Sequence, residues 1–149
     1  LYITSARHEN AFPADLVLLQ SSTPQGMCNI ETSQLDGETN LKIKQAVGAT
    51  YSIEVAADGR DAAERLGPFT LKSSAPNPKM DAAAWNGQLV LHNEFEDESD
   101  DEARVGKLRE RTVALSSTQL LLRGCTLRNT DWIVAMTVFT GKETKLLLN

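Results

Sequence analysis

The feature that most constrains this chain is a series of short apolar runs separated by turn-forming residues. Each run is four to eight residues long, and Gly or Pro stands between many of them. Residues 41–44 and 51–55 alternate apolar and polar side chains, which is the period of a half-buried strand. Short runs at this spacing favour a β-sandwich or β-barrel over alternating strand–helix units. The expected strands are residues 15–20, 27–33, 41–44, 51–55, 69–73, 87–92, 119–123 and 132–139.

Two segments have the pattern of short helices instead. Residues 58–66 are rich in Ala and are followed by Gly67 and Pro68, a combination that commonly ends a helix. Thr140 and Glu143 have the spacing of a capping box, in which each of the two side chains caps the other's backbone N–H. We therefore expect a second helix over residues 140–149.

The net charge of −5 comes from one segment. Residues 94–102 hold seven of the 20 acidic residues, and without them 13 acidic residues stand against 15 basic ones. This balance, with only 5% aromatic residues, argues against a nucleic-acid-binding surface. The low apolar content of residues 94–113 predicts a flexible acidic insert; a regulatory or partner-binding insert is the alternative.

Cysteine, histidine and glycine patterns exclude several kinds of site. Cys28 and Cys125 form no Cys-x-x-Cys pair, so no structural zinc site is expected, and a reduced pair is favoured over a single disulfide. His8 and His92 lack the spacing of a metal pair, and we interpret both as structural or surface residues. Walker A and Gly-x-Gly-x-x-Gly motifs are absent from the sequence, so we expect this chain to hold no cofactor and no metal.

The chain length of 149 residues fits one domain. No apolar run approaches the ~20 residues that a membrane span requires. The sequence does not begin with Met and ends in the Leu-rich residues 146–148, which indicates a piece of a longer protein.

One polar segment carries a candidate site. Asp36 and Gly37 form a tight-turn signal between two strand-like runs, and that turn would place Glu38 at the tip of a loop beside Thr39 and Asn40. By themselves, residues 36–39 can also be interpreted as a polar turn without a function. A glycosidase carboxylate pair formed by Asp36 and Glu38 is disfavoured, because residues so close in sequence rarely flank one glycosidic bond.

The sequence around this segment resembles a known family. Four stretches of the chain resemble, in the same order, segments of the actuator domain of type IV P-type ATPases, the phospholipid flippases. Residues 77–78 and 85–87 look like a degenerate copy of a further segment of that family. No match is seen at residues 50–70 and 94–113. The four stretches are residues 12–19, 30–44, 121–132 and 138–146.

The resemblance implies a role for the polar loop. Glu38 would orient the water that hydrolyses an aspartyl-phosphate intermediate, with Asp36, Gly37 and Thr39 as the supporting loop. Other P-type ATPases generally carry Thr-Gly-Glu at this loop, so Asp36 favours the lipid-transporting branch. The implied fold is a distorted β-barrel or jelly roll, resembling a double-stranded β-helix, over residues 1–149, with residues 140–149 starting a stalk helix towards a membrane span.

The resemblance also implies what lies outside this chain. No Asp-Lys-Thr-Gly-Thr occurs here, so the phosphorylation and nucleotide-binding domains, with ATP and Mg²⁺, would belong to the rest of the same polypeptide. Further implied partners are an accessory β-subunit and a phospholipid reached through the membrane domain, with no nucleic acid. The fragment itself would be soluble, inactive alone and on the cytosolic face of a membrane. The alternatives are the actuator domain of a cation-transporting P-type ATPase and a β-rich interaction module.

Overall fold

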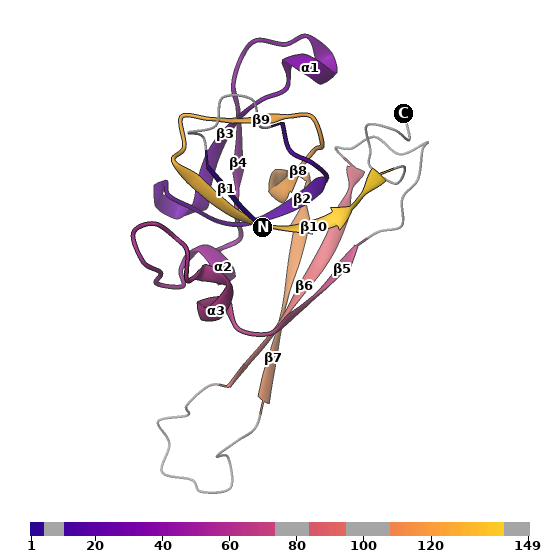
Figure 1. The fold of residues 1–149 in the computed structure, drawn as a ribbon. Helices are drawn as coiled ribbons and strands as arrows, with labels where there is room; N and C mark the ends of the chain where they lie inside the picture. The colour runs from indigo at the N-terminus through magenta and orange to yellow at the C-terminus, as the bar shows by residue number, and fades with distance from the viewer. Residues whose placement is uncertain (5–10, 74–83, 95–107, 142–149) are drawn as a thin grey trace, which may run out of the picture.

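The structure, a computed structural model, describes residues 1–4, 11–73, 84–94 and 108–141. Its strands form three antiparallel sheets (Figure 1). Sheet A has the order β1 (Tyr2–Thr4), β10 (Trp132–Phe139), β2 (Asp15–Ser21), β8 (Leu120–Leu121). Sheet B has the order β4 (Lys42–Gln45), β3 (Met27–Glu31), β9 (Thr126–Arg128), and sheet C the order β5 (Phe69–Ser73), β6 (Asn86–Glu94), β7 (Leu108–Ser116).

The helices are short and lie in the connections between strands. They are α1 (Ser33–Asp36), α2 (Gly48–Tyr51), α3 (Ala62–Leu66) and the 3₁₀ turns η1 (Pro24–Gly26) and η4 (Ser117–Gln119). The prediction of a mainly β domain with short helices is confirmed. Over the described residues the sheets stay separate and close into no barrel. The strands at the edges of sheets A and B, β8 and β9, have only two and three residues, which is too few to join the two sheets.

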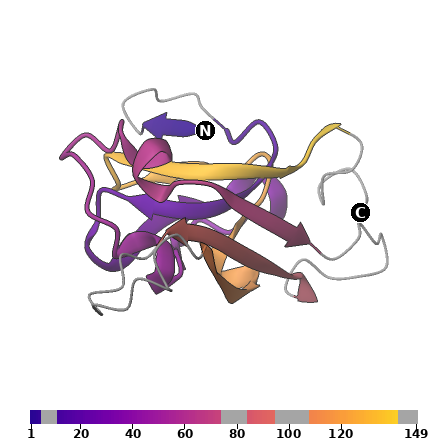
Figure 2. The ribbon, with the colours of Figure 1, turned by 90° about the horizontal axis from the view of Figure 1, so that it is seen from below.

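Strand β2 runs through the middle of the core. Leu16 and Leu18 pack into a cluster with residues of sheet B, whereas Val17 and Leu19 pack into a cluster with residues of sheet C. In the view of Figure 2, β10 and β2 lie side by side with strands of sheet C below them. The alternating side chains of one strand therefore fill two separate parts of the core.

The expected strand at residues 51–55 is wrong. Residues Gly48–Tyr51 form α2 instead, and no strand follows before α3. The buried side-chain amide of Gln20 donates hydrogen bonds to the backbone carbonyls of Thr50 and Ile53, at 2.8 and 3.0 Å. Because a side chain from β2 satisfies these carbonyls, this segment needs no neighbouring strand.

The boundary expected for the acidic insert, residues 94–113, is also wrong at its C-terminal end. Residues 108–113 belong to β7, which pairs with β6 over its full length. Exposed charged residues such as Glu110 and Arg111 give this strand the composition of a loop in the sequence. In the structure Leu115, near its C-terminal end, is buried against sheet A. Residues 95–107 lie outside the described residues.

Other element boundaries differ from expectation by a few residues. The helix expected at 58–66 is limited to Ala62–Leu66, and the strand expected at 119–123 is limited to Leu120–Leu121. Strands β1 and β9 were not predicted, because three-residue strands show no period. The helix expected from Thr140 lies almost entirely outside the described residues, which end at Gly141 in this region.

Gly59 generates a stability prediction. It is buried with φ of 68°, and a Cβ added there would overlap the ring of Trp132. We expect Gly59→Ala to lower the free energy of unfolding by about 2–4 kcal/mol, combining ~1 kcal/mol of left-handed strain with ~1–3 kcal/mol of overpacking. Urea unfolding of the 149-residue chain measures this.

Gly37→Ala is the matched control, because Gly37 has a similar φ of 72° but no atom within 4 Å of an added Cβ. It should cost only about 1 kcal/mol. Equal losses for the two variants would show that the Trp132 contact contributes nothing.

Candidate functional site

The candidate site is the connection between β3 and β4. The two strands pair antiparallel, with Cys28 opposite Lys44 and Ile30 opposite Lys42. The connection carries α1, and Figure 1 shows it projecting from the top of the molecule, away from sheet C. Sheet B thus presents this loop at one end of the fold.

Asp36 and Gly37 do not form the expected two-residue turn. Asp36 is the last residue of α1, and Gly37 takes the left-handed conformation (φ 72°, ψ 0°) that ends the helix. The N–H of Gly37 donates to the carbonyl of Ser33 at 2.9 Å. Leu35 is partly buried against the core, which winds residues 33–36 into a helical turn and makes Gly37 its C-cap.

Asp36 is the centre of the hydrogen bonds in the loop. Its carboxylate accepts from the hydroxyl of Thr32 at 3.0 Å, from the backbone N–H of Glu38 at 2.9 Å and from the ammonium of Lys42 at 3.0 Å. The Glu38 N–H, then Lys42 and Thr32, hold the pKa of Asp36 below its usual range. Asp36 therefore fixes the backbone at Glu38 directly.

Glu38 lies beyond the helix, at the exposed tip of the loop. Its side chain is 59% exposed, and Oε2 lies 3.1 Å from the ammonium of Lys42. Thr39 and Asn40 are also exposed. The sequence-based placement of Glu38 at a loop tip, with Asp36, Gly37 and Thr39 around it, agrees with this geometry.

The base of the loop is joined to β9 by an ion pair. Arg128 contacts Oε2 of Glu31 through Nε and Nη2, both at 2.9 Å, and the hydroxyl of Ser33 donates to Oε1 of Glu31 at 2.8 Å. The Ser33 hydroxyl, followed by Arg128, lowers the pKa of Glu31. A pocket of about 430 Å³ lies here; its lining includes Gln34, Gly124 and Thr126. The charged groups in it are paired with each other.

Strand β4, which leaves the loop, exposes apolar side chains and turns a lysine inward. Ile43 is 65% exposed and Leu41 42% exposed, whereas Lys44 turns inward and donates to the backbone carbonyl of Ser117 at 2.7 Å. Burial lowers the pKa of Lys44. The alternation predicted a strand correctly, and its apolar residue, Ile43, lies on the outer face.

Both cysteines are buried near Lys44 and carry free thiols. Burial raises the pKa of Cys28 to about 12 and that of Cys125 to about 11, so both thiols are protonated at neutral pH. They belong to the core cluster between sheets A and B.

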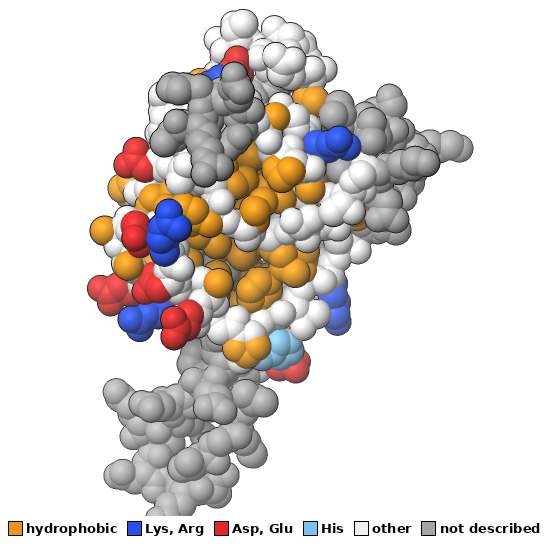
Figure 3. All heavy atoms as spheres, viewed as in Figure 1, with side chains coloured by type: hydrophobic (Ala, Val, Ile, Leu, Met, Phe, Trp, Pro, Cys, Tyr) orange, Lys and Arg blue, Asp and Glu red, His pale blue; other side chains and the backbone are white. Residues whose placement is uncertain are grey.

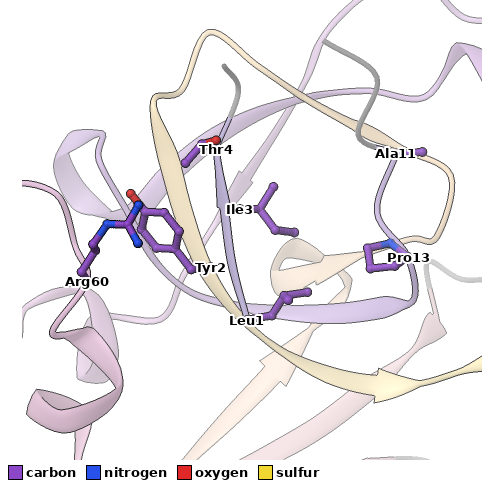
Figure 4. A pocket seen from close by; sticks show the side chains of 7 residues that line it. All are labelled: Leu1, Tyr2, Ile3, Thr4, Ala11, Pro13 and Arg60. Atoms are coloured by element: carbon purple, nitrogen blue, oxygen red, sulfur yellow. The ribbon is translucent and has the colours of Figure 1, made fainter. Parts of the chain in front are cut away.

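A second pocket lies away from the loop. It has about 440 Å³ and is lined by Leu1, Tyr2, Ile3, Thr4, Ala11, Pro13 and Arg60 (Figure 4). Hydrophobic side chains gather in the middle of this face (Figure 3). The guanidinium of Arg60 stacks 4.8 Å from the ring centre of Tyr2, which itself stacks on Trp132. Its lining offers no nucleophile–base pair among the described residues.

The described ranges show neither a cluster of metal-binding side chains nor a helix that could cross a membrane. These residues contain no group of three His, Cys, Asp or Glu side chains placed to bind a metal ion. His92 contacts Glu110 and Thr70 on the surface of sheet C, and His8 lies outside the described residues. None of the helices described is long and apolar enough to cross a membrane.

Comparison with known proteins finds relatives that are much longer than this chain. No protein-family model matches it. It is 40% identical to the phospholipid-transporting ATPase DRS2 of Saccharomyces cerevisiae over 148 residues, 99% of this chain and 9% of that protein. It is 40% identical over 145 residues to the phospholipid-transporting ATPase FetA of Mus musculus (95% of this chain, 10% of that protein). The chain is homologous to a segment of phospholipid-transporting ATPases.

A third relative, the phospholipid-transporting ATPase VA of Homo sapiens, is 38% identical over 145 residues, 96% of this chain and 8% of that protein. The chain thus spans about a tenth of the length of these relatives. The resemblance drawn from residues 30–44 and the other stretches is confirmed at the level of this group of ATPases.

Sequence reasoning missed three residues that build the site: Thr32, Lys42 and Arg128. Lys42 stands four residues after Glu38, a spacing that allows an ion pair. Thr32 could have been suspected from its position four residues before Asp36. Arg128 gave no signal, since its partner Glu31 lies 97 residues away in sequence.

Asp36 generates a pH prediction. Its folded-state pKa is depressed, so its contacts stabilise the fold fully above the ordinary Asp pKa of ~3.9 and less as the pH falls through the lower folded value. We expect Asp36→Asn to reduce the free energy of unfolding at neutral pH, and this difference from wild type should shrink below about pH 4. Urea unfolding at a series of pH values measures it. Asp131→Asn, at an exposed position outside the loop, is the control, and a difference independent of pH would contradict the assignment.

Proposed function

We propose that this chain is the actuator domain of a type IV P-type ATPase, a phospholipid flippase, and that Glu38 orients the water that hydrolyses the aspartyl-phosphate intermediate. The observation that supports this most is the exposed Glu38 carboxylate at the end of a loop whose backbone is held by Asp36. The homology to phospholipid-transporting ATPases supports the reaction class.

The proposed chemistry needs a carboxylate that can enter another domain's site. Water attacks phosphorus, the bond between phosphorus and the aspartyl oxygen breaks, and inorganic phosphate and a free aspartate carboxylate result. Glu38 holds the water in line and takes its proton. Gly37 has open space around its Cα, so the loop can approach the acyl phosphate without a side chain between them.

The remaining parts of the reaction belong to the rest of the proposed protein. Its phosphorylation and nucleotide-binding domains would supply ATP, Mg²⁺ and the acceptor Asp, and its membrane domain and accessory β-subunit would handle the phospholipid. The chain would lie on the cytosolic face, with residues 140–149 starting a stalk helix. The three sheets would correspond to the distorted jelly roll of an actuator domain.

Glu38→Gln in the full-length protein tests the proposed function. The change keeps the shape and removes the charge, so the phosphoenzyme should form as in wild type. Its breakdown should slow by roughly 10²-fold, the lower end of general-base effects, and lipid transport should stop with it. Phosphoenzyme decay after a chase with unlabelled ATP measures this.

Glu54→Gln, at another exposed glutamate outside the loop, is the matched control and should decay as wild type. Decay of the Glu38→Gln phosphoenzyme at the wild-type rate would overturn the role of Glu38. Failure of Glu38→Gln to form a phosphoenzyme would assign this residue a structural role.

The isolated chain should hydrolyse no ATP, because the proposed acceptor Asp and nucleotide site lie in other domains. The measurement is phosphate release by purified chain with ATP and Mg²⁺. Release that disappears on a substitution in this chain would contradict the proposal.

A further inference from the structure

The ammonium of Lys42 lies between the two carboxylates of the loop. Nζ is 3.0 Å from Oδ2 of Asp36 and 3.1 Å from Oε2 of Glu38. Lys42 is the first residue of β4, and its backbone is fixed opposite Ile30 of β3. Its side chain therefore reaches from an ordered strand to the tip of the loop.

The two carboxylates are not held equally. The Asp36 carboxylate also accepts three other hydrogen bonds. The hydroxyl of Thr32 contacts both of its oxygens, and the backbone N–H of Glu38 donates to one of them. Among the described residues, the hydrogen bonds and ion pairs of the Glu38 carboxylate involve Lys42 alone. Asp36 thus anchors Lys42, and Lys42 in turn orients Glu38. Both carboxylates raise the pKa of Lys42, Asp36 more than Glu38, so the ammonium stays charged.

We propose that Lys42 is a positioning residue for Glu38. It ties Oε2 of Glu38 to the anchored Asp36, so that Oε1 is available to hold the water. This inference rests on the proposed function, since it concerns how Glu38 is held for the breakdown of the phosphoenzyme.

The arrangement explains why a carboxylate at position 36 matters. The backbone of Glu38 could be capped by any short oxygen-bearing side chain. A carboxylate at position 36 also forms an ion pair with the ammonium that Glu38 shares. An exposed ion pair contributes little to the free energy of unfolding, so the proposed role of this pair concerns the Glu38 side chain and not the stability of the fold.

The test compares Lys42→Met and Lys42→Arg in the full-length protein by phosphoenzyme decay after a chase with unlabelled ATP. Lys42→Met should form the phosphoenzyme normally and break it down about tenfold more slowly, less than the ~10²-fold loss that a displaced reacting group causes. Lys42→Arg keeps a cation of similar reach and should retain most of the rate. If Lys42→Met yields too little protein, Lys42→Gln replaces it, and the same slowing of phosphoenzyme decay is expected.

Two further measurements separate positioning from a structural role. In a Glu38→Gln background, Lys42→Met should cause little additional slowing, because the two residues act through one interaction. Raising the salt from ~0.1 M to ~1 M should slow wild-type decay but leave Lys42→Met nearly unchanged, since screening weakens an exposed ion pair. Arg65→Met removes an exposed ion pair of the same i, i+4 spacing on α3 and is the matched control, with wild-type decay expected.

The outcomes are distinct from those for the proposed function. Slow decay in Glu38→Gln with wild-type decay in Lys42→Met overturns the positioning role and leaves the proposed function standing. The positioning role is also overturned if Lys42→Met slows phosphoenzyme decay as much in the Glu38→Gln background as in wild type. Wild-type decay in Glu38→Gln overturns the proposed function and this inference with it.

Discussion

Burial of β2 on both faces is the constraint on which the rest of the structure depends. Leu16, Val17 and Leu18 are fully buried, although they alternate between two clusters. Burying an aliphatic side chain contributes about 1.5–3 kcal/mol relative to leaving it exposed. A strand with both faces covered needs a layer on each side, and sheets B and C supply these layers.

Polar residues at both ends of β2 connect the loops to this core. Asp15 is fully buried and accepts from the backbone N–H of Arg123 at 2.9 Å. Gln20 holds the segment around α2 through the carbonyls of Thr50 and Ile53. Since buried polar groups require partners, these contacts determine where the chain can turn.

The candidate site combines a fixed base with an exposed tip. Leu35 packs on the core, and the Glu31–Arg128 pair joins the end of β3, at the base of the loop, to β9. At the tip, Asp36 and Lys42 restrict Glu38 without covering it. In the proposed function the Glu38 carboxylate has to be both oriented and accessible, and this loop leaves it 59% exposed while Lys42 contacts it.

Several features could be predicted because they depend on residues close together in sequence. The runs that form β2, β5 and β10 were apparent from their apolar content and the turns around them. The end of the element before Glu38 was apparent from Gly37, which takes the left-handed conformation after α1. The nature of that element, a helix rather than a strand, required knowledge that Leu35 meets the core.

By itself, the sequence determined the mainly β class, the position of the polar loop and the likeness to lipid-transporting ATPases. The tertiary structure decided which side of a strand faces inward. Lys44 turns inward and donates a hydrogen bond to the carbonyl of Ser117, 73 residues away, while the neighbouring Ile43 is exposed. It also decided that Lys42 spans Asp36 and Glu38. A periodic pattern shows that one face differs from the other, but only distant partners determine which face is buried.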